Sequence, residues 1–316
     1  MKHKLILTLI GLLLLAGGLA MAVIAPLEMV CFLLFSEGGR FYFEGFGFGS
    51  LVFAIIAWQV IAYDFIALVC VPLGYGHVRR RSWARPLTLT ALWSWLIVGA
   101  PLSVVIWFMA ISFKNPSQTM GLFVLPLLGF LIYPVLPVIL IRFYNSEAVK
   151  RAFEPQDSTS NWIHAMPIPI LMLGFLFVFY LIVLHIPFFF NGIFPLFGTW
   201  ANEMQGMLVA DGAILCLAWL TWGTLRRKAW AWWGDVVYFG LLTTSVIVTL
   251  VQSSLGNILA MTHLAPLEIQ AFQNVPLQGW HLAMFIGIPL IATLGLILFS
   301  RPHFREFESD FSQELP

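Results

Sequence analysis

Hydrophobic residues occur along the chain in long uninterrupted runs that are separated by short polar segments. A helix needs about 20 mainly apolar residues to cross a hydrocarbon core roughly 30 Å thick. Prolines within such a run are compatible with a transmembrane helix, because neighbouring helices satisfy the freed carbonyl groups. The pattern therefore predicts an all-α, polytopic integral membrane protein. We expect eight transmembrane helices, at 5–25, 50–76, 87–112, 120–141, 167–187, 200–224, 236–255 and 281–299.

The first run also has features of a secretory signal peptide. Lys2 and Lys4 precede an apolar stretch, and Ala20-Met21-Ala22 has the form of a cleavage site. The apolar run nevertheless continues beyond that site through Val23 and Ile24. We therefore expect the first helix to be retained, with cleavage as the alternative.

Basic residues indicate the orientation of these helices. With the N-terminus in the cytoplasm, fourteen of the sixteen lysines and arginines lie on the cytoplasmic side, and only Arg40 and Lys114 lie outside. Cytoplasmic loops of membrane proteins carry such an excess of positive charge. The distribution predicts a bacterial-type inner membrane protein with both termini in the cytoplasm, and it supports an even count of eight helices.

An internal repeat links two of the predicted helices and the turns that follow them. Residues 64–84 and 211–231 align without a gap at an offset of 147, and eight of 21 positions are identical. Both segments cross the membrane in the same direction, as a parallel duplication about the membrane normal requires. We expect two parallel tandem four-helix repeats at 1–144 and 163–300, a cytoplasmic linker at 145–162 and an acidic cytoplasmic tail at 301–316.

The repeated segments end in matching basic turns. In each, a glycine precedes three basic residues, and a tryptophan and an alanine follow within three positions. Basic side chains favour the anionic cytoplasmic leaflet, and tryptophan favours the membrane interface. We interpret these residues as topology anchors; a phosphate or dinucleotide site is the alternative. The anchors are Arg79, Arg80, Arg81 and Trp83 in the first turn, and Arg226, Arg227, Lys228 and Trp230 in the second.

Composition supports the membrane assignment and excludes several classes of protein. The chain is 60% hydrophobic and 10% charged, whereas soluble domains are about 25% charged. Its net charge of +1 provides no field to attract nucleic acid. The three cysteines form no CxxC pair, and the seven histidines form no HExxH motif, so no metal site is predicted. A two-histidine site between helices stays open, and the sequence identifies no cofactor.

Asp64 and Asp211 are the candidate intramembrane polar site. Each lies 12 residues before the glycine of its turn, hence roughly 18 Å from the cytoplasmic helix end. No lysine or arginine lies within the eight runs, and an acid at that depth costs several kcal/mol. We expect both carboxyls to face the protein interior, with Tyr63 and His185 as polar neighbours. They could join helices by hydrogen bonds or bind a proton or cation.

A comparison with presenilin-type aspartyl proteases is suggested by Tyr63-Asp64 and Gly234-Asp235, which resemble the YD and GxGD motifs. The second motif lacks its first glycine. Asp235 also lies close to the basic turn, where we expect it to cap or begin the seventh helix. Two catalytic carboxyls must meet at one depth to share a proton, so this resemblance does not support a protease. No catalytic residue is predicted.

Two functional classes remain. The chain has 29 phenylalanines and 13 tryptophans and few polar groups within its helices, which favours contact with lipid or protein over a hydrated pathway. The first expectation is a non-catalytic binding protein, scaffold or accessory subunit of a membrane complex. Its partners would be the lipid bilayer and other membrane-protein subunits. The alternative is a transporter or permease-like carrier with a proton- or cation-linked site at Asp64 and Asp211, and a membrane enzyme ranks third.

Overall fold

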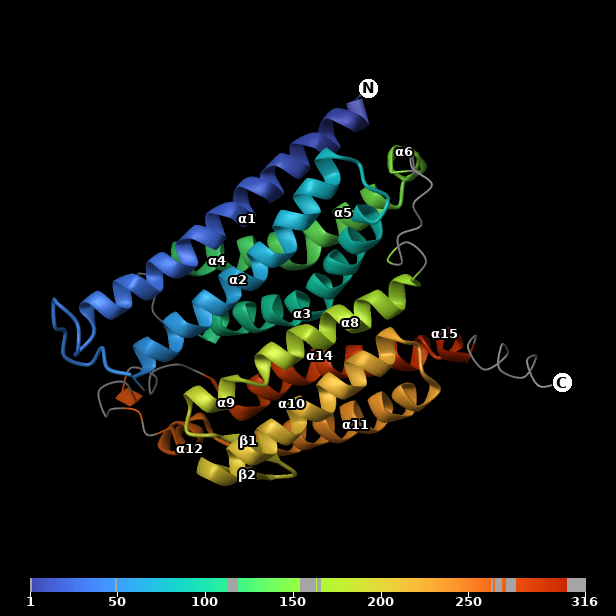
Figure 1. The fold of residues 1–316 in the computed structure, drawn as a ribbon. Coiled ribbons are helices and arrows are strands. Elements are labelled where there is room, and N and C mark those ends of the chain that lie inside the picture. The colour runs from blue at the N-terminus through green and yellow to red at the C-terminus, as the bar shows by residue number, and fades with distance from the viewer. Residues whose placement is uncertain are drawn as a thin grey trace. The chain divides into compact units, whose positions relative to one another are not determined.

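The computed structural model describes residues 2–48, 50–112, 119–153, 163, 166–262, 264, 269–270 and 277–305. Eight helices in this part of the chain are long and apolar enough to cross a membrane, as predicted. They comprise α1 (Lys2–Phe35), α2 (Leu51–Val78), α3 (Ala84–Ser112), α4 (Thr119–Phe130) with α5 (Leu136–Tyr144), α8 (Ile168–Val183) with α9 (Ile186–Phe189), α10 (Glu203–Leu225), α11 (Ala229–Val251) and α14 (Gly279–Phe299) (Figure 1). A π-helical turn, Leu131–Val135, joins α4 to α5.

Two helix limits differ clearly from the predicted ones. Helix α1 continues through Pro26 to Phe35, ten residues beyond the predicted end, because one missing backbone donor does not end a membrane helix. Helix α11 begins at Ala229, seven residues earlier than expected. The carbonyl of Lys228 accepts the Ala231 N–H, so the helix begins directly after the basic turn. Short helices also occur at Glu147–Ala152 (α6), Leu255–Ala260 (α12) and Pro302–Arg305 (α15).

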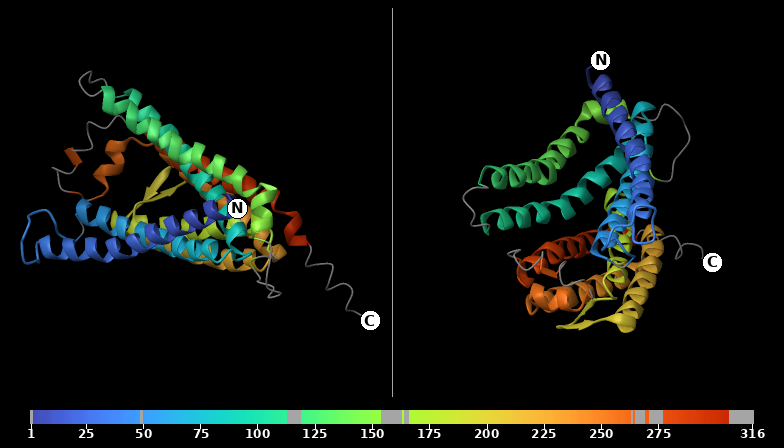
Figure 2. Two further views of the ribbon diagram at one scale, coloured as in Figure 1. Left: turned by 90° about the horizontal axis from the view of Figure 1, so that it is seen from above. Right: turned by 90° about the vertical axis from the view of Figure 1, so that its left-hand side faces the viewer.

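Residues 1–88, 143–165 and 264–270 form one compact unit. Within it, α1 and α2 lie side by side along their length (Figures 1 and 2). Glycines permit this close approach: a Cβ on Gly74 would lie 2.6 Å from the Leu15 backbone nitrogen, and one on Gly11 would lie 2.8 Å from the His77 Cβ. Small residues at helix contacts stabilise membrane proteins because close packing replaces the hydrophobic driving force.

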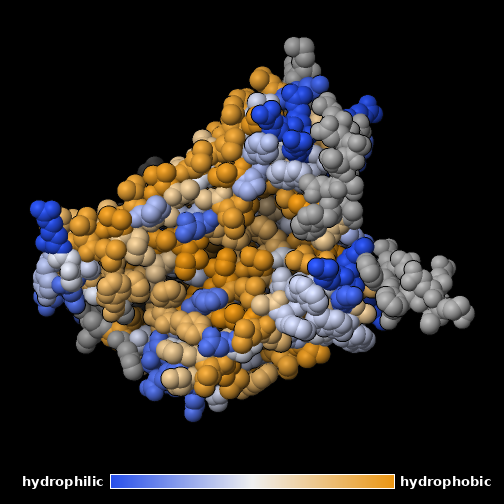
Figure 3. All heavy atoms as spheres, in the orientation of Figure 1, coloured by the Kyte–Doolittle hydropathy of each residue, from blue (hydrophilic) through white to orange (hydrophobic). Residues whose placement is uncertain are grey.

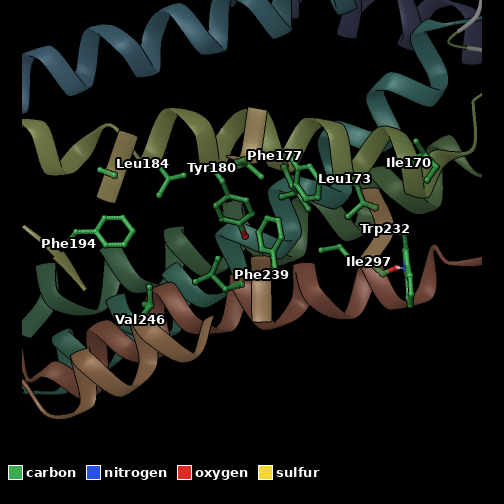
Figure 4. Packing of buried hydrophobic residues seen from close by; sticks show 14 of the residues in the cluster. Ile170, Leu173, Phe177, Tyr180, Leu184, Phe194, Trp232, Phe239, Val246 and Ile297 are labelled. Carbon is green, nitrogen blue, oxygen red and sulfur yellow. Dashed lines mark hydrogen bonds between the residues drawn. The ribbon is translucent and has the colours of Figure 1, made fainter. Parts of the chain in front are cut away.

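Residues 89–142, 166–263 and 271–316 form the second compact unit. Its core lies among α8, α10, α11 and α14 (Figure 4). The ring of Phe177 stacks on Phe239 at 5.0 Å, and the Tyr180 hydroxyl lies 2.8 Å from the Thr293 hydroxyl. The Trp232 indole donates to the Ile297 carbonyl at 2.9 Å. Large aromatic side chains thus fill this core, and their polar atoms have partners.

A β-hairpin before α10 was not predicted. Strands β1 (Phe194–Leu196) and β2 (Thr199–Ala201) pair antiparallel, with Pro195 opposite Trp200. The two connecting residues, Phe197 and Gly198, both have positive φ, as a type I′ turn requires. Their backbone N–H groups donate to the hydroxyls of Ser245 and Thr249 on α11, at 3.0 and 2.9 Å. Side chains nearly 50 positions away therefore hold this hairpin.

The two compact units group the helices differently from the predicted repeats. Most of α3, all of α4 and most of α5 belong with the C-terminal helices, so the boundaries at 1–144 and 163–300 stay a prediction. Of the predicted linker and tail, residues 154–162 and 306–316 lie outside the described residues.

Candidate functional site

Asp64 and Asp211 lie on exposed faces of α2 and α10. The expectation that both carboxyls face the protein interior stays a prediction, and within its own compact unit each residue is exposed. Helix α10 buries its opposite face, which includes Gly206, Ala210 and Leu217. The two acids also belong to different compact units. The structure therefore presents each carboxyl separately, at the surface of its unit.

Asp211 lies in a continuous exposed stripe of α10. Members of the stripe recur every three or four residues, which places them on one face of a helix. Apart from Asp211 they are apolar and strongly exposed, for example Leu208 at 63% and Leu215 at 71%. We call this set the α10 stripe; it consists of Met204, Leu208, Asp211, Leu215, Trp219 and Trp222. Figure 3 shows that hydrophobic residues cover most of the visible surface of the helices, with fewer hydrophilic residues among them.

The carboxyl of Asp211 has no hydrogen-bond or ion-pair partner within the described part of the chain. It lies eight residues after the start of α10, about 12 Å along the helix, so its short side chain cannot reach the headgroups. An aspartate at the centre of a membrane helix costs about 2.5–3.5 kcal/mol. Lipid alone is thus an unfavourable neighbour for this group.

Asp64 shares part of this environment on α2. Leu68, one turn later, is 71% exposed, as is Leu215 at the equivalent position of α10. The exposed face continues to Tyr75 at 47%, but Ala57, two turns before Asp64, is buried. The exposed face around Asp64 is therefore shorter than the α10 stripe.

The predicted polar neighbours do not complete a site. Tyr63 is half-buried beside Asp64 in the sequence. His185, at the end of α8, donates from Nδ1 to the Leu181 carbonyl at 2.7 Å. Asp211 and His185 share no described contact. Neither His185 nor Tyr63 therefore supplies a partner for Asp211 within its unit.

The two basic turns have the same backbone structure. Arg80 and Arg227 both have positive φ, 49° and 54°. In each turn this residue donates to the carbonyl three positions earlier, and the next residue donates to the carbonyl five positions earlier. Such a pair of bonds defines a Schellman C-cap, which usually places glycine at the left-handed position. The two turns therefore share one backbone geometry at an offset of 147 residues.

Asp235 was not predicted as a candidate site residue. It lies six residues into α11 and is fully buried, so the expectation that it begins or caps the helix is wrong. Its Oδ2 accepts a hydrogen bond from the Thr224 hydroxyl at 2.5 Å. Its Oδ1 has no partner among the described residues. The sequence feature that could have indicated this bond is the spacing of Thr224 and Asp235, which lie 11 residues apart on either side of a tight turn between two helices.

A second buried polar cluster lies in the first unit. His77 donates from Nδ1 to the Leu73 carbonyl at 2.6 Å, so its Nε2 accepts from the Tyr144 hydroxyl at 2.7 Å. Arg85 donates from Nε to the Tyr144 carbonyl at 2.9 Å. The two bonds to Tyr144 join the end of α5 to the end of α2 and the start of α3, which indicates a structural role.

Among the residues that the structure describes, no group of three or more histidine, cysteine, aspartate or glutamate side chains is placed to hold a metal ion. Comparison with protein-family models, with curated proteins and with solved structures finds no match for the chain.

Proposed function

We propose that this protein is a non-catalytic accessory or scaffold subunit of a membrane complex. We assign the α10 stripe as its docking surface for a transmembrane helix of another protein. The observation that supports this proposal is the exposed, unpartnered Asp211 within an otherwise apolar face. A partner that contacts Asp211 would remove the cost of a carboxyl in lipid and would bury the flanking apolar residues.

The chemistry of Asp211 specifies the partner. A carboxylate in low dielectric is stabilised by a cation or by hydrogen-bond donors. Within the described residues, none of the eight long apolar helices carries a lysine or arginine near its middle; Lys4, Arg85 and Arg142 lie at helix ends. A second copy could not supply the cation. We therefore propose a different protein whose transmembrane helix carries a lysine or arginine near its centre.

The location and the finer architecture belong to the same proposal. We place the chain in a bacterial-type inner membrane with both termini in the cytoplasm, because that orientation puts fourteen of sixteen basic residues inside. We also propose two parallel tandem four-helix repeats. The shared backbone of the two basic turns supports this duplication.

Energy transfer in liposomes tests the docking surface. The full chain carries a donor dye, and two designed leucine-rich transmembrane peptides carry the acceptor, one with a single central lysine and one without. We expect transfer to the lysine peptide to exceed transfer to the all-leucine peptide, and Asp211→Asn to remove this excess by eliminating the carboxylate charge. Asp64→Asn is the matched control, because that carboxyl lies on a shorter exposed face.

Two results would contradict the proposal. Equal transfer to both peptides would show that Asp211 does not recruit a cation-bearing helix. Loss of the excess in both aspartate variants would show that the effect is not specific to Asp211, and that the α10 stripe alone is not the docking surface.

A further inference from the structure

Three exposed tryptophans form a cluster at the end of α10 and the start of α11. The ring centroids of Trp219, Trp222 and Trp230 lie 5.7, 5.9 and 6.5 Å apart. The three residues keep 64%, 50% and 42% of their surface exposed. We call them the tryptophan platform. Their indole N–H groups have no acceptor within the described chain, so each ring offers an apolar face and a free donor.

The turn that follows α10 creates this platform. A Cβ on Gly223 would lie 2.6 Å from the Trp230 ring, so only glycine lets this ring lie against α10 beside Trp222. The turn also requires Arg227 in the left-handed conformation, which costs roughly 1–2 kcal/mol for a residue other than glycine. The sequence thus keeps an arginine where glycine would be less strained.

Positive charge lies directly beside the rings. The Arg226 guanidinium lies 5.9 Å from the centre of the Trp222 ring. Arg227 and Lys228 follow in the same turn. A phosphate at this end of the helix would meet basic groups, and hydrocarbon below it would meet the indole faces.

We propose that the turn between α10 and α11 binds one anionic phospholipid. The basic residues hold its phosphate, and its acyl chains lie on the tryptophan platform. An exposed apolar platform directly beside the charges suits a lipid and would serve no purpose for free phosphate. The platform shares Trp219 and Trp222 with the α10 stripe, but the inference does not rest on a partner at Asp211, since Trp222 lies 11 residues from Asp211, about 16 Å along the helix.

The turn between α2 and α3 is a control within the same chain. It has the same backbone, three arginines, and a glycine against which Trp83 packs. The positions equivalent to Trp219 and Trp222 are Pro72 and Tyr75, so it lacks the platform. We expect it to attract an anionic leaflet in general without holding one lipid.

Tryptophan quenching by brominated lipids tests the proposal. The full chain is placed in two vesicles that contain the same fractions of phosphatidylglycerol and phosphatidylcholine, with bromine on the first lipid or on the second. Surface charge is then constant. We expect quenching by brominated phosphatidylglycerol to exceed quenching by brominated phosphatidylcholine about fivefold, because one basic residue near the membrane surface favours an anionic lipid by about that factor. Arg226→Gln with Lys228→Gln should remove it, and Arg79→Gln with Arg81→Gln should leave it.

A second measurement tests the role of the tryptophan rings. Fluorescence quenching cannot test it, because replacing a tryptophan changes the fluorescence itself. Phosphatidylglycerol added to the detergent-solubilised protein should raise its Tm by mass action. We expect this rise to be lost in Trp222→Leu and kept in Trp83→Leu.

Three outcomes would overturn the proposal. One is equal quenching by both brominated lipids. Another is equal loss in both pairs of basic variants, which would indicate general attraction to the leaflet. The third is removal of the preference by millimolar inorganic phosphate, which would show that the site takes phosphate without lipid.

Discussion

Asp235 and Thr224 join the end of α10 to the start of α11 through a buried hydrogen bond. A buried acceptor that loses its donor costs more than the bond itself contributes, because water cannot replace the donor. One oxygen of Asp235 already lacks a partner in the described structure. Thr224 is therefore the residue on which the burial of this carboxyl depends.

Replacement of Thr224 by valine should lower the stability of the protein by about 1–3 kcal/mol, because Asp235 then has no donor. The measurement is thermal unfolding in detergent, followed by circular dichroism. Thr221→Val is the matched control. The Thr221 hydroxyl is also buried but donates only to the Leu217 carbonyl of its own helix. A Tm that falls equally in both variants would contradict a special role for Thr224.

The close packing of α1 against α2 depends on glycine residues at the contact between the two helices. Close helix approach leaves no room for a methyl group at Gly74, which meets the backbone of α1 on the facing side. A side chain here forces the two helices apart along their contact. Helix α1 also contains a glycine without such a contact, Gly17, where a Cβ would meet nothing within 4 Å.

Gly74→Ala should therefore destabilise the pairing of α1 with α2, by about 1–3 kcal/mol for an overpacked contact. Gly17→Ala should be neutral or slightly stabilising, since alanine is the better helix former. Unfolding of both variants in detergent, monitored by a dye pair on the two helices, measures the difference. An equal response of the two variants would show that close packing at Gly74 does not hold this pair.

Orientation in the membrane is a property of the whole molecule. Eight helices are long and apolar enough to cross the membrane, and if all eight cross it, the start of α1 and the end of α14 lie on the same side. The charge of the connecting segments selects that side. The matching basic turns after α2 and α10 should both contact the cytoplasmic leaflet.

Reporter fusions after Arg81, Asp157, Arg227 and the C-terminus should all indicate the cytoplasm, because the basic residues nearest these points favour that side. Paired alkaline phosphatase and fluorescent protein fusions at each point report on which side of the membrane that point lies. A fusion in the hairpin between β1 and β2 serves as the opposite control and should indicate the outside. A C-terminus on the outside would contradict the eight-helix topology.

The number of membrane helices could be predicted from the sequence, because the length of an apolar run is a local property that sets what can span a bilayer. The equivalence of the basic turns could also be predicted, since Gly76 and Gly223 with the tryptophans after them determine the local backbone. These features can be predicted without knowing which helices contact one another.

Only the tertiary structure decided which side of each helix is covered. A membrane helix is apolar toward both lipid and protein, so periodicity does not reveal its buried face. For this reason the sequence did not reveal that Asp211 is exposed within its unit, and Asp235 was expected at a helix end and is buried. The hairpin was missed on similar grounds, because its short strands depend on Ser245 and Thr249 of a distant helix. Packing between helices determines which faces of α10 and α11 are buried, and contacts with the distant α11 hold the hairpin.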